Sequence, residues 1–366
     1  MRLTQLRLHQ FRSYEQLTLL PPSGTTVLVG ENGAGKTNLL EAIHLCCLGR
    51  SHRTSNDRDM IRLGSRTCAV HAHVARAAVN DEVGVRLFAQ QGERKVIYVN
   101  GKTVSRIGEL MGHMTCVMFS PEDLGLVKGS PQERRTYLDM LLSQSQAAYF
   151  YAIQTYHSIL RQRNALLKEI ARGRADARSL EVWDEQLANA AGPIVIHRRD
   201  AANTISGLAA EHYAYIADRG REGFFMRYQS SLADSLDPRE TLMQQLAASR
   251  EDDLRRLTTS YGPHRDELRL MLEGQEMRSF ASQGQARTAA LAMRLAQIDI
   301  LTKAHNETPL LLLDDVLSEL DAGRQTRLLV RLDRMQTLLT CTELNGLKNV
   351  NPHAVLTVKD GTVLSL

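Results

Sequence analysis

The sequence has few of the residues that define several large protein classes. Only five of its 366 residues are cysteines, and Cys46, Cys47, Cys68, Cys116 and Cys341 form no C-x-x-C pair. This spacing argues against a disulfide framework and against a cysteine-held metal. It fits reduced thiols in a cytoplasmic protein.

Long apolar segments are also absent. The best candidate for a membrane span, Leu39 to Leu48, is short and is interrupted by Glu41 and His44. The first residues lack the apolar core and small-residue cleavage site of a signal peptide. We therefore expect a soluble, cytoplasmic protein without a membrane partner.

The bulk composition is that of an ordinary globular protein, with 43% hydrophobic and 23% charged residues. It excludes disordered and fibrous classes. A chain of 366 residues is long enough for two or three structural units. The net charge of +4 is a mild basic excess that suits a polyanionic partner.

The predicted secondary structure changes twice along the chain, from strands to helices and back to strands. Residues 1–130 carry strand patterns, one early helix and an Asn100-Gly101 hairpin signal. No strand pattern is evident from Glu133 to Leu257, where Gly173, Gly192-Pro193, Gly220 and Asp237-Pro238 predict breaks between helices. A buried helical stripe is predicted at Tyr149, Ile153, Tyr156, Leu160, Arg163, Leu167 and Ile170.

Strand patterns return near the end of the chain. Glu267 to Leu272 reads as a strand, and Leu310 to Leu313 is apolar throughout, as in a buried parallel sheet. We therefore predict an α/β fold in which a first lobe, residues 1–130 and 259–366, is interrupted by an all-helical second lobe, residues 131–258.

The segment between a predicted strand and a predicted helix matches the phosphate-loop pattern G-x-x-x-x-G-K-[ST]. Its glycines let main-chain N–H groups face a phosphate, its lysine reaches the β and γ phosphates, and its threonine offers a hydroxyl to Mg²⁺. The predicted nucleotide-binding residues are Gly30, Glu31, Asn32, Gly33, Ala34, Gly35, Lys36 and Thr37. The loop predicts ATP with Mg²⁺, and the lobe formed by residues 1–130 and 259–366 is therefore predicted to be an ATPase lobe.

Two consecutive carboxylates follow the apolar strand. Asp314 is predicted to support Mg²⁺, and Asp315 to orient an attacking water near the γ-phosphate. Taken alone, they also fit an apolar strand capped by acidic loop residues. The phosphate loop favours the catalytic interpretation.

A third element precedes a predicted helix. Ser282 and Gln285 have the spacing of a capping box, and a capped helix start with Gly284 is also an anion site. Its position before the acidic strand resembles the signature loop of ABC-type ATPases, which acts on ATP held by a second copy of the chain. Ser318 to Asp321 then resembles the loop that lines that dimer interface.

These elements together resemble the RecF family of bacterial DNA replication and repair proteins, which is related to the ATPase heads of structural-maintenance-of-chromosomes (SMC) proteins. The resemblance extends from Leu3 to about Thr342, and the block around Tyr261 is its most specific part. The motifs that carry it are Phe11-Arg12-Ser13-Tyr14, the phosphate loop, Ser51 to Thr54, Phe119 to Leu124, Tyr261 to Asp266, Ser282 to Gln285 and Leu313 to Asp321.

The resemblance implies a switch driven by ATP. ATP binding is expected to produce a head-to-head homodimer on single-stranded, gapped or junction DNA, and slow, DNA-stimulated hydrolysis is expected to release it. The implied roles are recombinase loading, replication-fork restart and SOS induction. RecR is the implied partner, with RecO in the same pathway.

Several positions depart from ABC-type ATPases or stay open. Asp315 stands where many of them carry glutamate, and Thr340-Cys341-Thr342 replaces the segment with the switch histidine. Ser120 to Asp123 reads as a helix cap in the place of a glutamine loop. Arg12 and Arg53 either reach the nucleotide or are solvated. Tyr261 to Asp266 is either a structural turn or part of an interface.

DNA contact is indicated only by charge. Basic residues cluster after the first helix and along the helical insertion, but such runs are usually solvated faces. The two groups are Arg50, His52, Arg53, Arg58, Arg62 and Arg66, and Arg161, Arg163, Lys168, Arg172, Arg174 and Arg178. No base-reading motif is present, which predicts recognition of DNA structure rather than base sequence.

Three other classes share the phosphate loop. The alternative function is the ATPase subunit of a membrane transporter, which normally has a shorter insertion than the one between Lys36 and Ser282. A long-armed chromosome-organising ATPase needs hundreds of residues of coiled coil. A phosphotransferase needs no signature loop.

Overall fold

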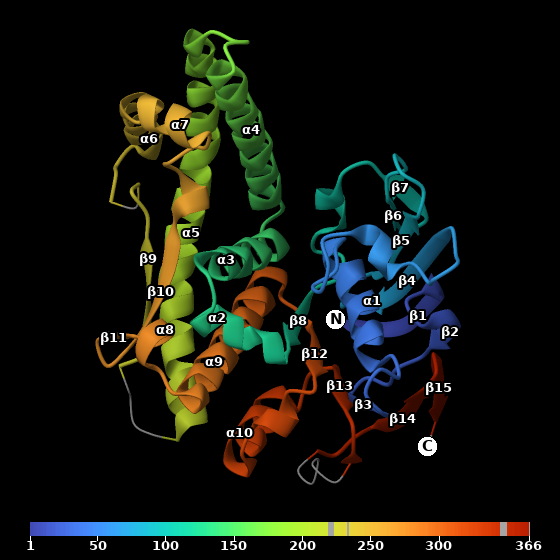
Figure 1. Cartoon of the computed structure of the whole chain (residues 1–366). Helices are drawn as coiled ribbons and strands as arrows, with labels where there is room; N and C mark the ends of the chain where they lie inside the picture. Colours follow the sequence, from blue (N-terminus) through green and yellow to red (C-terminus); the bar gives the residue numbers. More distant parts are fainter. Residues whose placement is uncertain (219–222, 233, 345–349, 366) are drawn as a thin grey trace. The chain divides into compact units, whose positions relative to one another are not determined.

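The computed structural model describes residues 1–218, 223–232, 234–344 and 350–365. The chain divides into two compact units, which we call the first and second unit (Figure 1). The first unit comprises Met1–Asp123, His212–Arg219 and Ala290–Leu366, and the second comprises Leu124–Glu211 and Gly220–Ala289. In the described part of the chain, no helix is long and apolar enough to cross a membrane.

One six-stranded sheet of the first unit is antiparallel. Alternate residues of its strand β4 are buried, which is the pattern of a sheet with one face against a core. Its strand order is β2 (Tyr14–Leu19), β1 (Arg2–Phe11), β4 (Thr67–Ala75), β5 (Asn80–Phe88), β6 (Val96–Val99) and β7 (Lys102–Val104).

The other six-stranded sheet is parallel except for its last strand, β15, which is antiparallel to β14. Its order is β15 (Thr362–Ser365), β14 (Ala354–Lys359), β3 (Thr25–Val29), β13 (Thr337–Cys341), β12 (Leu310–Asp314) and β8 (Cys116–Phe119). Leu310 to Leu313 are fully buried, which confirms the predicted parallel strand. The carboxyl ends of β3, β12 and β13 therefore lie at one edge.

Helix α1 (Lys36–Leu48) contacts strands of both six-stranded sheets, among them β4 and β12. Most of its residues are buried, including Glu41 and His44. A helix that is buried on nearly all sides is fixed in position by its neighbours. The phosphate loop thus leads into a rigid part of the first unit.

The other elements of the first unit are a short helix, 3₁₀ turns, and parts of two helices that are divided between the two units. Asp321 caps α10 (Ala322–Leu332) by accepting from the N–H of Arg324 at 3.0 Å. The 3₁₀ turns are η1 (Asp57–Met60), η2 (Ile107–Leu110), η3 (Pro121–Asp123) and η6 (Leu317–Glu319). The end of α5 (Leu180–Ala217) and most of α9 (Gln283–His305) also belong here.

The second unit combines helices with a small sheet. The sheet order is β11 (Gln275–Glu276), β10 (Glu267–Leu272) and β9 (Phe225–Gln229). The helices are α2 (Leu124–Lys128), α3 (Pro131–Ser145), α4 (Ala147–Ala171), most of α5, α6 (Pro238–Ala248), α7 (Arg250–Arg256), α8 (Met277–Phe280) and the start of α9, with turns η4 (Ala177–Ser179) and η5 (Pro263–Arg265).

The apolar stripe of α4 is confirmed, because all its predicted members except Ile170 are buried. Its side chains pack against residues of α5 such as Leu187 and Ile194. The predicted break at Gly192-Pro193 is wrong, because α5 continues through Pro193. Buried Ala191, Ile194 and Val195 surround the proline, so packing compensates for its lost hydrogen bond. The break predicted at Gly220 lies outside the described residues.

The helical segment also contains a strand that the sequence did not predict. Strand β9 lies within residues 131–258, so this lobe is not all helical. Its five residues are too few for a clear period, and its pairing partner β10 lies about forty positions later. The second unit includes residues 259–289, which the sequence had assigned to the ATPase lobe. The division into folding domains stays a prediction.

Candidate functional site

The loop from Gly30 to Thr37 joins β3 to α1, as predicted. Gly35 caps α1 with φ of 112°, a left-handed conformation that favours glycine. A Cβ at Gly35 would lie 2.7 Å from Ser13 Oγ, and one at Gly30 would lie 2.3 Å from the carbonyl oxygen of Val358. Close packing therefore requires glycine at both positions.

Lys36 is a buried residue, 8% exposed, and its ammonium lies inside this loop. Its Nζ donates to the carbonyl oxygens of Gly30 at 2.6 Å and Glu31 at 2.9 Å. Within the described residues, no carboxylate forms an ion pair with Lys36. A buried cation without a counter-charge is a favourable place for an anion.

Side-chain oxygens of three residues meet beside Lys36. The Thr37 hydroxyl donates to Asp314 Oδ1 at 3.0 Å, and the Thr340 hydroxyl donates to the same atom at 2.7 Å. No group of three His, Cys, Asp or Glu side chains is placed to hold a metal in the described ranges. One carboxylate, one hydroxyl and phosphate oxygens fit Mg²⁺, which usually keeps several waters.

The next residue, Asp315, has an unusual backbone. Its φ is 51°, a left-handed value that is uncommon for aspartate. Its N–H donates to Thr340 Oγ1 at 2.9 Å, and its carbonyl oxygen accepts from Ser318 Oγ at 2.8 Å. These bonds offset the strain and fix the main chain of Asp315 directly after β12.

These groups surround a cavity of about 290 Å³ in the first unit. Its lining includes eight predicted site residues: Asn32, Gly33, Gly35, Lys36, Thr37, Arg53, Asp314 and Asp315. Sequence reasoning did not assign the other four lining residues, Asn38, Pro121, Glu122 and Thr340, to the site. The position of Thr340 near the end of a strand was a signal that could have found it, because the carboxyl ends of parallel strands lie at the same edge of a sheet.

Arg12 lies outside this lining. Its guanidinium donates to both oxygens of buried Glu41, at 2.8 and 2.7 Å. The Ser51 hydroxyl donates to the same carboxylate at 2.5 Å, and Arg53 donates to Asn38 Oδ1 at 3.0 Å. Arg53 thus faces the cavity, while a contact between Arg12 and nucleotide stays a prediction.

Burial alone raises the pKa of Glu41. Hydrogen bonds from Arg12 and Ser51, with the charges of Arg12 and Arg53, nevertheless hold that pKa below its ordinary value. Glu41 is therefore an ionised anchor in the core of the first unit.

The residues after Arg12 support the loop directly. The Tyr14 hydroxyl donates to the carbonyl oxygen of Gly35 at 3.0 Å, and the Asn38 amide donates to Ser13 Oγ at 3.1 Å. The motif that carried part of the family resemblance therefore holds the phosphate loop in shape.

The predicted capping box at Ser282 is confirmed. The N–H of Ser282 donates to Gln285 Oε1 at 2.9 Å, and the N–H of Gln285 donates to Ser282 Oγ at 3.2 Å. Ser282 and Gly284 belong to the second unit and are not among the residues that line the cavity. Their predicted action is on ATP held by another copy, so it stays a prediction.

The segment from Ser120 to Asp123 forms the predicted cap with Asp123 as the acceptor. The Asp123 carboxylate accepts from the N–H of Ser120 at 3.1 Å and pairs with Arg294 at 2.6 Å. This turn presents Glu122 to the cavity. Tyr261 to Asp266 forms a turn in the second unit, where His264 contacts Tyr156 at 2.6 Å.

Comparisons with known proteins give a consistent result. The model of the RecF/RecN/SMC N-terminal domain family matches residues 2–363. The DNA replication and repair protein RecF of Symbiobacterium thermophilum is 39% identical, over 100% of this chain and 98% of that protein. RecF of Lachnoclostridium phytofermentans is 38% identical, over 98% of each.

A solved structure extends the match to the fold. The recombination mediator protein RecF with ATP, from the RecFOR pathway, has a TM-score of 0.92 and 32% identity, over 100% of this chain and 97% of that chain. The predicted ABC-type ATPase head is confirmed by this fold. The chain therefore belongs to the RecF family of DNA replication and repair proteins.

Proposed function

We propose that this chain binds ATP in the first-unit cavity and uses slow hydrolysis as a switch on DNA. The observation that carries the proposal is Lys36, a buried residue whose ammonium has no carboxylate partner in the described residues and lies in the phosphate loop. Main-chain N–H groups of the loop bind the phosphates, and Arg53 adds a second cation at the rim. A relative solved with ATP supports this choice of nucleotide.

Thr37 and Asp314 are the proposed magnesium ligands. Their oxygens already lie 3.0 Å apart, and both line the cavity. Mg²⁺ held there would neutralise charge on the β and γ phosphates. Thr340 keeps Asp314 oriented toward that position.

Asp315 is the proposed group that orients the attacking water. Its backbone is fixed by Thr340 and Ser318, and the residue lines the cavity. Aspartate is one methylene shorter than glutamate, so contact with the water is less direct and hydrolysis is slow. Slow hydrolysis suits a switch whose ATP-bound form must persist.

The proposed active form is a head-to-head homodimer. Ser282 and Gly284 at the capped start of α9 would bind the γ-phosphate of ATP held by the other copy. Such a dimer would bind single-stranded, gapped or junction DNA in the cytoplasm and stimulate hydrolysis there. Assistance to recombinase loading, fork restart and SOS induction, with RecR and RecO as partners, completes the proposal.

The transporter alternative is not favoured. The full-length relatives are named as DNA replication and repair proteins, and one solved relative is named as a recombination mediator.

Solution mass by light scattering tests the switch. Wild type is compared with Asp315→Asn, each with and without ATP·Mg²⁺ and a gapped duplex. The expected result is a dimer that needs ATP, persists longer in Asp315→Asn and is strengthened by DNA. A monomer under every condition overturns the dimer.

Two further variants separate binding from assembly. Lys36→Ala is expected to abolish ATP binding, because the loop loses its cation. Ser282→Arg is expected to keep ATP binding and to lose dimerisation. Normal dimerisation in both variants would contradict the proposed head-to-head homodimer.

A further inference from the structure

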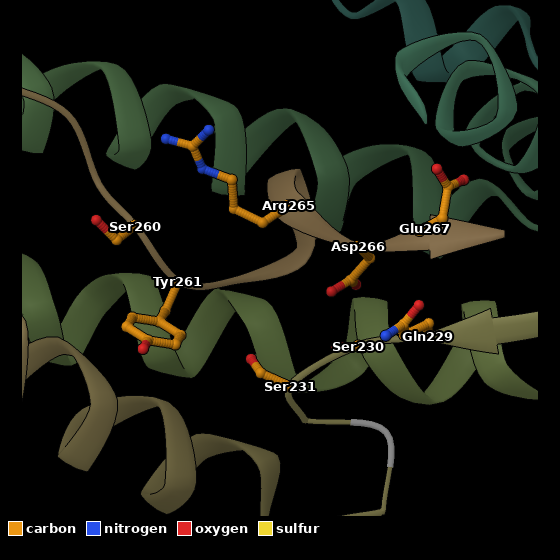
Figure 2. Close-up of a pocket in the computed structure, with 8 residues that line it drawn as sticks. All are labelled: Gln229, Ser230, Ser231, Ser260, Tyr261, Arg265, Asp266 and Glu267. Atoms are coloured by element: carbon orange, nitrogen blue, oxygen red, sulfur yellow. The ribbon is translucent and has the colours of Figure 1, made fainter. Parts of the chain in front are cut away.

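A second cavity, of about 450 Å³, lies within the second unit and has no part in the ATP site. Figure 2 shows it between the loop that carries Tyr261 and Arg265 and the end of β9. Its lining residues are Gln229, Ser230, Ser231, Ser260, Tyr261, Arg265, Asp266 and Glu267. Its volume is in the range of small-molecule pockets.

The two acidic lining residues are engaged by the protein itself. Asp266 is 3% exposed, accepts from the Tyr228 hydroxyl and lies 3.7 Å from Arg198 Nη1. Burial raises the pKa of Asp266, and hydrogen bonds and the charge of Arg198 partly offset this effect. Glu267 forms a two-pronged pair with Arg134 at 2.8 and 2.9 Å. Neither carboxylate is therefore a free charge in the cavity.

The local charge balance is positive. Arg135 donates to the carbonyl oxygen of Asp266 at 2.7 Å, and Arg198 pairs with Asp139 at 2.7 Å. The cluster contains the four arginines Arg134, Arg135, Arg198 and Arg265 and the three carboxylates Asp139, Asp266 and Glu267. An anionic group at this rim gains a favourable potential.

Three other lining residues carry polar or aromatic side chains. The Ser260 hydroxyl oxygen is buried and has no hydrogen-bond partner among the described residues. Tyr261 is 39% exposed. Exposed Arg265 uses Nε and Nη2 to bind the carbonyl oxygen of Thr259, at 3.2 and 2.8 Å, which fixes its guanidinium.

These groups match the parts of a nucleotide. An exposed aromatic ring stacks on an unpaired base, a hydroxyl reads the base edge, and a guanidinium binds phosphate. In Figure 2 the Tyr261 ring and the Arg265 guanidinium extend from the loop in different directions. Separate places for a flat group and an anion fit a nucleotide better than a compact anion.

We propose that this cavity binds one nucleotide unit, with its base on Tyr261 and its phosphate at Arg265. The source is either a free mononucleotide or an unpaired base of a DNA strand. The strand as source rests on the proposed function, whereas the chemistry of the pocket does not.

Tyr261 variants test the proposal through fluorescence anisotropy with labelled oligo(dT) and calorimetry with dTMP. Tyr261→Ala is expected to weaken the affinity about fivefold or more, the cost of losing one stacked base. Tyr261→Phe keeps the ring and is expected to bind like wild type. Phe225→Ala is the matched control, because Phe225 is a similarly exposed aromatic at 42% and does not line the cavity.

Arg265 is tested by salt dependence. Arg265→Gln is expected to weaken oligonucleotide binding and to reduce the slope of log affinity against log salt by about one. Arg269→Gln, an exposed arginine on β10 outside the cavity lining, is the control for loss of one charge. ATP hydrolysis without DNA and the thermal midpoint are expected to stay unchanged in all these variants.

The outcomes distinguish a free nucleotide from a DNA strand as the ligand. They also distinguish the proposed nucleotide site from the proposed ATP switch. Competition by dTMP that is lost in Tyr261→Ala supports a free nucleotide, and binding of oligo(dT) alone supports a strand. Equal oligonucleotide and dTMP binding by wild type and Tyr261→Ala overturns the proposed nucleotide site, even if ATP-dependent dimerisation on DNA is normal. Absence of that dimerisation with Tyr261-dependent binding intact overturns only the proposed switch.

Discussion

The hydroxyl of Thr340 donates to Asp314 Oδ1 at 2.7 Å, across two neighbouring parallel strands. The same hydroxyl oxygen accepts from the N–H of Asp315 at 2.9 Å. One side chain of β13 therefore orients both carboxylate residues at the end of β12. It occupies the segment in which ABC-type ATPases carry their switch histidine.

Thr340→Val tests this role, because valine keeps the shape and removes both hydrogen bonds. ATP hydrolysis is expected to fall about 10–100-fold, the usual effect of losing a residue that orients a metal ligand. ATP binding is expected to persist, since Lys36 and the loop are unchanged. Single-turnover hydrolysis and nucleotide binding measure the two effects. Thr342→Val, at an exposed position, is the control, and equal hydrolysis by both variants would contradict the role.

Glu41→Gln tests the anchor beneath the phosphate loop. The change removes a buried charge that accepts from Arg12 and Ser51. We expect a loss of about 1–3 kcal/mol in the free energy of unfolding at neutral pH, typical of hydrogen bonds to charged groups. Urea unfolding measures it, and Glu15→Gln, whose surface pair with Arg62 spans 3.8 Å, is the control.

The same variant has a defined pH dependence. Because the folded pKa of Glu41 lies below its ordinary value of 4.5, the unfolded chain binds more protons in the acid range. The stabilisation is therefore present above pH 4.5 and is lost as pH falls through the folded pKa. Glu41→Gln lacks this component, so its difference from wild type is expected to shrink in acid. A constant difference would show that ionisation of Glu41 is irrelevant.

Arg163→Met tests the buried ion cluster of the second unit. Arg163 is fully buried and donates to Asp184 and Asp253 at 2.7 Å each. Its loss leaves two buried carboxylates short of a partner, so we expect destabilisation by about 3–5 kcal/mol. Thermal and urea unfolding measure this loss. Arg161→Met, an exposed change two residues away on α4, is expected to have little effect.

His264 provides a spectroscopic prediction. Its Nδ1 lies 2.6 Å from the Tyr156 hydroxyl and its Nε2 lies 3.0 Å from the carbonyl oxygen of Thr259. The carbonyl only accepts, so Nε2 carries the proton and Nδ1 accepts from Tyr156. Burial lowers the pKa of His264 to about 4, which NMR titration is expected to show. Titration near pH 6.5 would contradict this arrangement.

His264 also contributes to stability with a known sign. Its folded pKa of about 4 is below the ordinary 6.5, so the unfolded chain binds more protons between these values. The free energy of unfolding is expected to fall as pH drops from 6.5 toward 4. His264→Gln is expected to reduce that slope.

Local features of the site could be predicted from sequence because each depends on a few neighbouring residues. The strand-loop-helix context of Lys36, the capping box of Ser282 and the buried strand before Asp314 are short-range patterns. The resemblance to RecF rested on such blocks, and the comparisons confirm it.

Other features could not be predicted because no single segment contains them. Strand β9 exists through pairing with β10 rather than through its own period. Pro193 continues a helix because its buried neighbours compensate for the missing hydrogen bond. The sequence left open whether Arg12 reaches the nucleotide, and it did not predict the contact of its guanidinium with Glu41, a partner that lies 29 positions away.

The sequence by itself determined the chemistry of the proposed ATP site, because the phosphate-loop pattern and the capping box depend only on the residue types at a few neighbouring positions. Tertiary structure decided the geometry. It brought Thr340 to Asp314, Glu122 to the cavity and Tyr261 to the end of β9. Strand register and side-chain packing join residues far apart in the chain, and these contacts depend on the whole core rather than on any local pattern.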